Sequence, residues 1–74
     1  MDNISLISGG FDPLHSGHIE YFKEAGQYGS IIVLLNSDDW LTYKKGRPFM
    51  PWVERAAVVR NLKGVIDVLD FDDM

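Results

Sequence analysis

The sequence predicts an α/β fold: one βαβαβ half of a doubly wound (Rossmann-like) parallel sheet. Three short runs, residues 4–8, 31–35 and 65–69, are mostly apolar and rich in β-branched residues. The first two are typical of buried parallel strands, and the third also predicts a strand. The stretches between them have helical periodicity, and glycines punctuate the connections. Two right-handed crossovers would place the second strand beside the first and the third beside the second. We expect a single domain over residues 1–74, truncated relative to a full doubly wound sheet.

The first helix is expected from about residue 17 to residue 27. His18, Phe22 and Ala25 follow one another at i, i+4 and i+7, with Tyr21 beside them. Residues at this spacing share one face of a helix. The pattern predicts that this face turns toward the sheet.

A second long helix is expected from Pro51 to about residue 63. Proline suits the first turn of a helix, because the amide hydrogen that it lacks has no partner there. Trp52, Ala56 and Val59 form one apolar stripe, and this stripe is expected to pack on the sheet. Gly64 is a candidate C-cap.

A short helix, capped by Asp38, is expected to pass through Trp40 and Leu41. The residues that follow, 44–51, read Lys-Lys-Gly-Arg-Pro-Phe-Met-Pro. Two prolines and a glycine in eight residues are typical of a loop, so we expect a basic loop between this helix and the next.

Composition excludes several classes of protein. The 74 residues contain no cysteine, which removes disulfides and cysteine-based zinc sites. The net charge of −4 argues against a nucleic-acid partner, because counterion release requires clustered lysine and arginine. No apolar run approaches the roughly 20 residues that span a bilayer, and no signal peptide is recognisable. The composition therefore predicts a small, marginally stable cytoplasmic domain with no membrane partner.

A ten-residue run after the first strand carries the chemistry. It reads Gly-Gly-Phe-Asp-Pro-Leu-His-Ser-Gly-His from Gly9 to His18. Two glycines allow a sharp turn and a close approach to a ligand. The following helix directs its N-terminus, with unpaired amides and partial positive charge, toward the same space. His15 and His18 lie on the first turn, so both imidazoles are placed to donate hydrogen bonds to one phosphate group.

This run resembles the G-x-F-D-x-x-H-x-G-H signature of the cytidylyltransferase-like nucleotidyltransferases. The resemblance continues through Asn-Ser-Asp at residues 36–38, Lys-Lys-Gly-Arg-Pro at 44–48 and Glu-Arg at 54–55. It therefore covers essentially the whole chain. It is nearest to the glycerol-3-phosphate cytidylyltransferase and heptose-phosphate adenylyltransferase branches.

The resemblance implies transfer of CMP or AMP from CTP or ATP to a phosphorylated small-molecule acceptor, with release of pyrophosphate. Mg²⁺ would accompany the triphosphate, and no metal site built by the protein alone is expected. By the same resemblance the site residues divide into three groups: catalytic His15, His18 and Lys45; nucleotide- or phosphate-binding Gly9, Gly10, Phe11, Asp12, Lys44 and Arg55; and acceptor-binding Asp38.

The relatives in this family carry a second half that the sequence lacks. It comprises two further strands and an R-x-x-x-I-S-T-T motif that binds the nucleotide, and nothing after Asp70 resembles it. The resemblance therefore covers the N-terminal half only, and the first strand is left as an open edge. We expect a homodimer or a partner segment to cover this strand. Two other functions stay open: a non-catalytic nucleotide- or phosphate-binding half-domain, and an assembly module completed by a partner chain.

Structural roles also stay open for several site residues. A role of the two histidines in helix capping or packing alone is the alternative, and their place in the ten-residue run argues against it. Arg55 is equally suited to a phosphate contact or to an ion pair with Glu54 or Asp38. Asp38 is equally suited to capping a helix and to lining the site. A zinc site at His15 and His18 would need further ligands.

Overall fold

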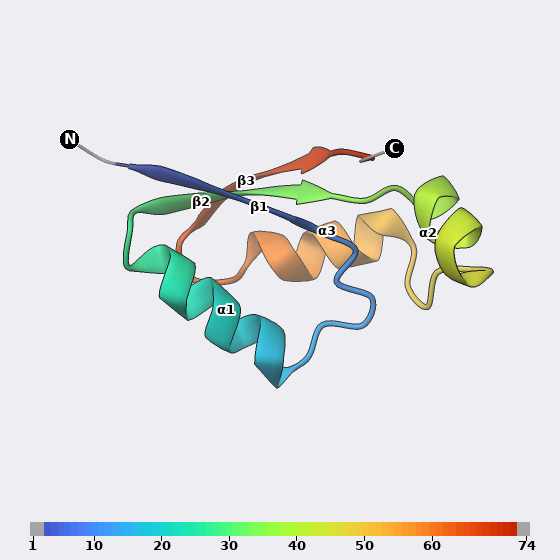
Figure 1. The fold of residues 1–74 in the computed structure, drawn as a ribbon, viewed down its shortest axis with the longest axis horizontal. Coiled ribbons are helices and arrows are strands. Elements are labelled where there is room, and N and C mark those ends of the chain that lie inside the picture. Colours follow the sequence, from blue (N-terminus) through green and yellow to red (C-terminus); the bar gives the residue numbers. More distant parts are fainter. Residues whose placement is uncertain (1–2, 73–74) are drawn as a thin grey trace.

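A computed structural model describes residues 3–72, which form a three-stranded parallel sheet and three helices (Figure 1). The elements in chain order are β1 (Ile4–Gly9), α1 (Ser16–Gly26), β2 (Ser30–Leu35), α2 (Asp38–Lys45), α3 (Trp52–Arg60) and β3 (Val65–Asp70). The strand order is β1-β2-β3, so β2 is central and β1 and β3 form the edges. The predicted α/β class and strand order are confirmed.

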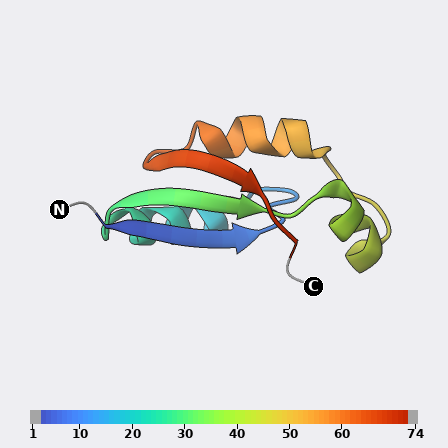
Figure 2. The same ribbon diagram turned by 90° about the horizontal axis from the view of Figure 1, so that it is seen from above.

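Both long helices, α1 and α3, lie on the same face of the sheet (Figures 1 and 2). This follows from the topology: two right-handed crossovers that step in the same direction place their helices on the same side. Ile7, Val33 and Val68 face one another across the three strands and all point toward these helices. The register between β2 and β3 shifts after the pair Ile31 and Val65, so Ile66 has no partner in the ladder.

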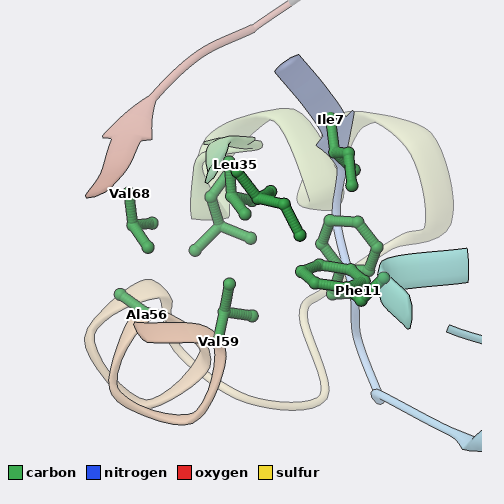
Figure 3. Packing of buried hydrophobic residues seen from close by; sticks show 9 residues of the cluster. Ile7, Phe11, Leu35, Ala56, Val59 and Val68 are labelled. Atoms are coloured by element: carbon green, nitrogen blue, oxygen red, sulfur yellow. The ribbon is translucent and has the colours of Figure 1, made fainter. Parts of the chain in front are cut away.

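The core fills the space between the sheet and the two helices. Figure 3 shows Val68 of β3 and Ala56 and Val59 of α3 close to Leu35 of β2, with Ile7 and Phe11 beside them. The cluster of buried residues comprises Ile7, Phe11, Phe22, Ile31, Val33, Leu35, Ala56, Val59 and Val68. The predicted stripe on α3 is confirmed, since Ala56 and Val59 are buried and Trp52 packs against the cluster.

The opposite face of the sheet has no helix over it in the described chain. Its side chains, alternating with those of the core, include Ile4 and Leu6 of β1, which are 56% and 65% exposed. Leu69 of β3 pairs with Leu34 on this face and is 45% exposed. The expectation of a strand buried on both faces is therefore wrong for β1. Residues 3–72 supply helices that cover one face of the sheet only.

Local boundaries differ from the sequence expectations at three points. The short helix extends to Lys45, so the lysine pair lies on α2 and not in the loop. Ser37 caps α2, its hydroxyl accepting from the Trp40 amide at 3.0 Å, whereas Asp38 is already helical. Gly64 is not the C-cap of α3, which ends at Arg60, but it has a φ of +91° in the turn before β3.

Tyr21 is 50% exposed and does not share the inward face of α1 as expected. The helix contacts the sheet through a narrow stripe centred on Phe22, the residue of α1 that is buried. No helix among residues 3–72 is long and apolar enough to cross a membrane.

Candidate functional site

The candidate site lies at the carboxyl ends of the strands. The loop after β1 leads to the N-terminus of α1, and α2 follows the end of β2 (Figure 1). Residues 46–51 are the part of the expected loop 44–51 that lies outside α2, and they connect α2 to α3. From here on, the name basic loop refers to residues 46–51. Carboxyl ends of parallel strands are where doubly wound sheets bind ligands. The structure thus brings together the ten-residue run, Lys45 and Arg55, which the sequence separates by up to 46 residues.

The two histidines form a reciprocal cap at the start of α1. His15 Nδ1 accepts a hydrogen bond from the Gly17 amide, and His18 Nδ1 accepts one from the His15 amide, each at 3.1 Å. The rings are stacked, with centroids 3.9 Å apart and an interplanar angle of 28°. A nitrogen that accepts from an amide carries no hydrogen, so the neutral rings bear their hydrogen on Nε2. The cap therefore gives each imidazole an Nε2–H donor at the positive end of a helix.

Gly17 is required by the cap. A Cβ at this position would lie 2.9 Å from His15 Cε1 and 3.1 Å from His15 Nδ1. We expect Gly17→Ala to displace the His15 ring and to weaken the binding of CTP and ATP about tenfold, measured by calorimetry, while the fold is retained. Gly26→Ala is the matched control, because its Cβ would meet nothing closer than Ile31 at 3.9 Å. Equal affinities in the two variants would contradict this account of Gly17.

The His18 ring has a lowered pKa. It packs edge-on against Phe11, with centroids 5.0 Å apart. Burial, and then the charge of His15, hold the pKa of His18 below its ordinary value of 6.5. The neutral ring is thus the favoured form in the folded protein near neutral pH.

This shift predicts a pH dependence of stability. As the pH falls below 6.5, His18 takes up a proton in the unfolded chain before it does so in the folded chain. The free energy of unfolding is therefore highest above pH 6.5 and decreases with falling pH until the pH is below the pKa of His18 in the folded chain. Urea unfolding at pH 7.5 and pH 5.5 measures the decline. We expect His18→Asn, which does not titrate, to flatten it. A decline of the same size in His18→Asn would show that another group is responsible.

Gly9, the last residue of β1, and Gly10, which follows it, allow close packing. A Cβ on Gly9 would lie 3.1 Å from Phe11 Cζ, and one on Gly10 would lie 2.8 Å from Leu41 Cδ2. The left-handed backbone conformation that turns the chain belongs to Phe11, with a φ of +48°, and its ring is buried against Phe22. The sharp turn therefore lies one residue later than expected. Backbone contacts from Gly9, Gly10 and Phe11 to a nucleotide stay a prediction.

Asp12 is engaged inside the protein. Its side chain is 1% exposed and accepts hydrogen bonds from the amides of Phe49 and Met50, the latter at 2.7 Å. Lys45 Nζ lies 3.0 Å from Asp12 Oδ2 and donates to the Asp12 backbone oxygen at 2.6 Å. Burial alone raises the pKa of Asp12, but these hydrogen bonds and the charge of Lys45 outweigh it and hold the pKa below 3.8. The expectation that Asp12 binds phosphate does not fit this buried, negatively charged carboxylate.

The two lysines have different surroundings. The Lys45 side chain is 41% exposed and lies beside Asp12. Asp12 precedes His15 by three residues, so the charge of Lys45 lies at the edge of the site. Lys44 Nζ instead lies 5.3 Å from the centre of the Trp40 ring, which stacks on Tyr43. Of the pair, Lys45 is the lysine that the structure joins to the ten-residue run.

Arg55 is buried, contrary to the expected phosphate contact. Its side chain is 0% exposed, and its guanidinium bonds Asp38 Oδ1 at 2.7 Å. Three backbone oxygens accept its other hydrogen bonds, those of Gly10 at 2.9 Å, Asn36 at 2.8 Å and Met50 at 2.9 Å. The alternative of an ion pair is the one that the structure shows, with Asp38 as the partner. Asp38 itself keeps a 44% exposed side chain, so a contact with an acceptor stays a prediction.

The comparisons with known proteins agree with this geometry. The sequence profile described as cytidylyltransferase-like matches residues 6–74, almost the whole chain. The chain belongs to the cytidylyltransferase-like family.

Three known proteins illustrate the similarity. The chain is 40% identical over 73 residues to a bifunctional protein HldE of Geobacter metallireducens, covering 95% of this chain and 15% of that protein. It is 39% identical to an FAD synthase of Pyrococcus abyssi, covering 86% of this chain and 45% of that protein. A solved lipopolysaccharide core biosynthesis protein of Thermoplasma volcanium superposes with a TM-score of 0.86 at 27% identity, covering 97% of this chain and 60% of the other. The chain thus spans less than two thirds of these relatives.

Contacts at the end of β3 were not foreseen from the sequence. Asp72 accepts from the Ser37 amide at 2.9 Å and from its hydroxyl at 2.7 Å, and Asn36 Nδ2 donates to the Phe71 oxygen at 2.9 Å. These bonds fasten the chain after β3 to the N-terminus of α2. The signal that could have predicted them is an acidic residue, Asp72, placed just after a strand, because a carboxylate is favoured near the N-terminus of a helix such as α2.

Within the described part of the chain, no group of three or more histidine, aspartate or glutamate side chains is arranged to hold a metal ion. Asp12 and Asp38 face Lys45 and Arg55, respectively. Both carboxylates are therefore already paired with a cationic side chain, and Mg²⁺ as a companion of the triphosphate stays a prediction.

Proposed function

We propose that this chain carries the phosphate-binding site of a nucleotidyltransferase, which transfers CMP or AMP from CTP or ATP to a phosphorylated small molecule. The observation that carries the proposal is the reciprocal cap of His15 and His18, which provides two Nε2–H donors at the N-terminus of α1. The family membership supports it, as do relatives that include an FAD synthase.

In the proposed reaction an oxygen of the acceptor phosphate attacks the α-phosphorus of the triphosphate. The bond from the α-phosphorus to the bridging oxygen breaks, and pyrophosphate leaves with those electrons. Negative charge on the phosphoryl oxygens is met by the two imidazole donors, the partial positive charge at the N-terminus of α1 and the ammonium of Lys45. No proton is taken from the acceptor, because its phosphate is already ionised at neutral pH.

Mg²⁺ is part of the proposal as a companion of the triphosphate, where it would neutralise charge on the phosphate oxygens. The exposed part of the Asp38 carboxylate is the proposed acceptor contact. Its bond to buried Arg55 fixes its position, so one oxygen is held while the other is available to an acceptor hydroxyl.

The direct test is an assay of pyrophosphate release. CTP and ATP are each offered with Mg²⁺ and with glycerol 3-phosphate or a sugar phosphate, and we expect release that requires one nucleotide and one acceptor. Arg60→Gln, on the exposed end of α3, serves as a control that retains activity. Binding of neither nucleotide to the folded chain would refute the proposal.

A second candidate is a half-domain that binds a nucleotide or phosphate without turnover. The sheet face formed by Ile4, Leu6 and Leu69 is apolar and exposed, which is typical of a surface that another polypeptide covers. This observation favours the second candidate, in which the chain supplies one part of a larger site. Calorimetry that finds nucleotide affinity, lost in His18→Asn, together with no pyrophosphate would identify this case. Sedimentation tests whether the cover is a second copy: a homodimer is expected then, and a monomer argues for a different partner segment.

A further inference from the structure

Two buried charged side chains hold the backbone of one residue of the basic loop, Met50, through its amide and its carbonyl oxygen. The Met50 amide donates to Asp12 Oδ1 at 2.7 Å, and the Met50 oxygen accepts from Arg55 Nε at 2.9 Å. The Phe49 amide donates to the other oxygen of the same carboxylate. Asp12 lies in the loop after β1 and Arg55 in α3, so the basic loop is held from two sides by elements distant in sequence.

Arg55 also joins this loop to the ends of the two strands that border the site. Its NH1 group donates to the Gly10 oxygen, just after β1, and to the Asn36 oxygen, just after β2. A planar guanidinium presents several donors in a fixed fork, which a lysine ammonium cannot reproduce. One buried residue thus sets the relative positions of three segments.

We propose that Asp12 and Arg55 are positioning residues, which hold the basic loop so that Lys45 stays at the edge of the phosphate site, and that neither contacts the substrate. The inference rests on the proposed function for the identity of the ligand. The contacts that carry it belong to the ligand-free chain. Lys45 is part of the same cluster, because its ammonium bonds both the carboxylate and the backbone oxygen of Asp12.

The charges of these residues allow a test by the sign of the effect. Asp12→Asn removes a negative charge near a site for a triphosphate, so a purely electrostatic role predicts tighter binding. A positioning role predicts weaker binding, because asparagine has one acceptor oxygen where two amides and an ammonium need partners. Arg55→Lys keeps the positive charge but loses the fork, so positioning again predicts weaker binding.

Two measurements are made on each variant. Amide hydrogen exchange of Phe49 and Met50 is followed by NMR in the ligand-free chain, and dissociation constants for CTP and ATP with Mg²⁺ are measured by calorimetry. For both variants we expect exchange at these amides to be at least tenfold faster and nucleotide binding about tenfold weaker. Asp39→Asn and Arg60→Lys are matched controls on exposed positions, and we expect no change in either measurement.

The outcomes separate this inference from the proposed function. Unchanged exchange, or unchanged or tighter nucleotide binding in Asp12→Asn, would overturn the positioning role. If the original chain binds neither nucleotide, the proposed function fails, and the exchange data still decide whether the two residues hold the loop. Circular dichroism checks folding; should Arg55→Lys unfold, trimethylamine N-oxide restores the folded state for both measurements, and Asp12→Asn gives an independent result.

Discussion

Replacement of His18 by asparagine is expected to lower pyrophosphate release about 100- to 1000-fold, the usual effect of losing one donor to transition-state charge. Asparagine places its Oδ1 close to the position of imidazole Nδ1, so it can still accept from the His15 amide. It has no group at the position of Nε2. The change therefore removes the donor but keeps the cap, and the free energy of unfolding at pH 7.5 should stay within about 0.5 kcal/mol.

His18→Gln is the matched control, because glutamine reaches the Nε2 position with an N–H donor but cannot accept at the Nδ1 position. We expect it to keep more activity than His18→Asn and to lose about 1 kcal/mol of stability with the cap. Pyrophosphate-release assays measure the activity, and urea unfolding measures the stability. If both variants lose activity equally, the ring itself and not its Nε2–H is what the reaction needs.

Replacement of Arg55 by alanine is expected to destabilise the folded chain by about 3–5 kcal/mol. Three backbone oxygens and the Asp38 carboxylate would lose their donor, and each unsatisfied buried group costs about 1–3 kcal/mol. A chain of 74 residues has roughly 4–11 kcal/mol of stability, at about 0.05–0.15 kcal/mol per residue. The variant is therefore expected to be largely unfolded or close to it.

Urea unfolding followed by circular dichroism measures this loss. Arg60→Ala is the control, because Arg60 is also an arginine of α3 but lies exposed at its end, and we expect a change within about 0.5 kcal/mol. A loss in Arg55→Ala as small as that in Arg60→Ala would mean that the hydrogen bonds of the buried guanidinium are replaced by water.

Local patterns in the sequence were enough to predict the three strands, the two long helices and the histidine pair of the candidate site. Apolar runs and helical periodicity are properties of neighbouring residues, so the strands, their order and α1 and α3 were predicted correctly. The histidine pair was also predictable, since residues three apart on a first turn lie side by side wherever that helix is placed. The same holds for the capping contacts, which join His15 only to Gly17 and His18.

The tertiary structure alone decided which charged residues face the site. Arg55 and Asp12 belong to the motifs that resemble a binding site, yet their bonds reach Gly10 and Met50, 45 and 38 residues away in sequence. Such partners depend on how the strand ends and the basic loop meet in space, which no spacing rule records. The same reason explains the strands: β1 is apolar on both faces in sequence, but burial is set by what packs against each face, and α1 and α3 both cover one.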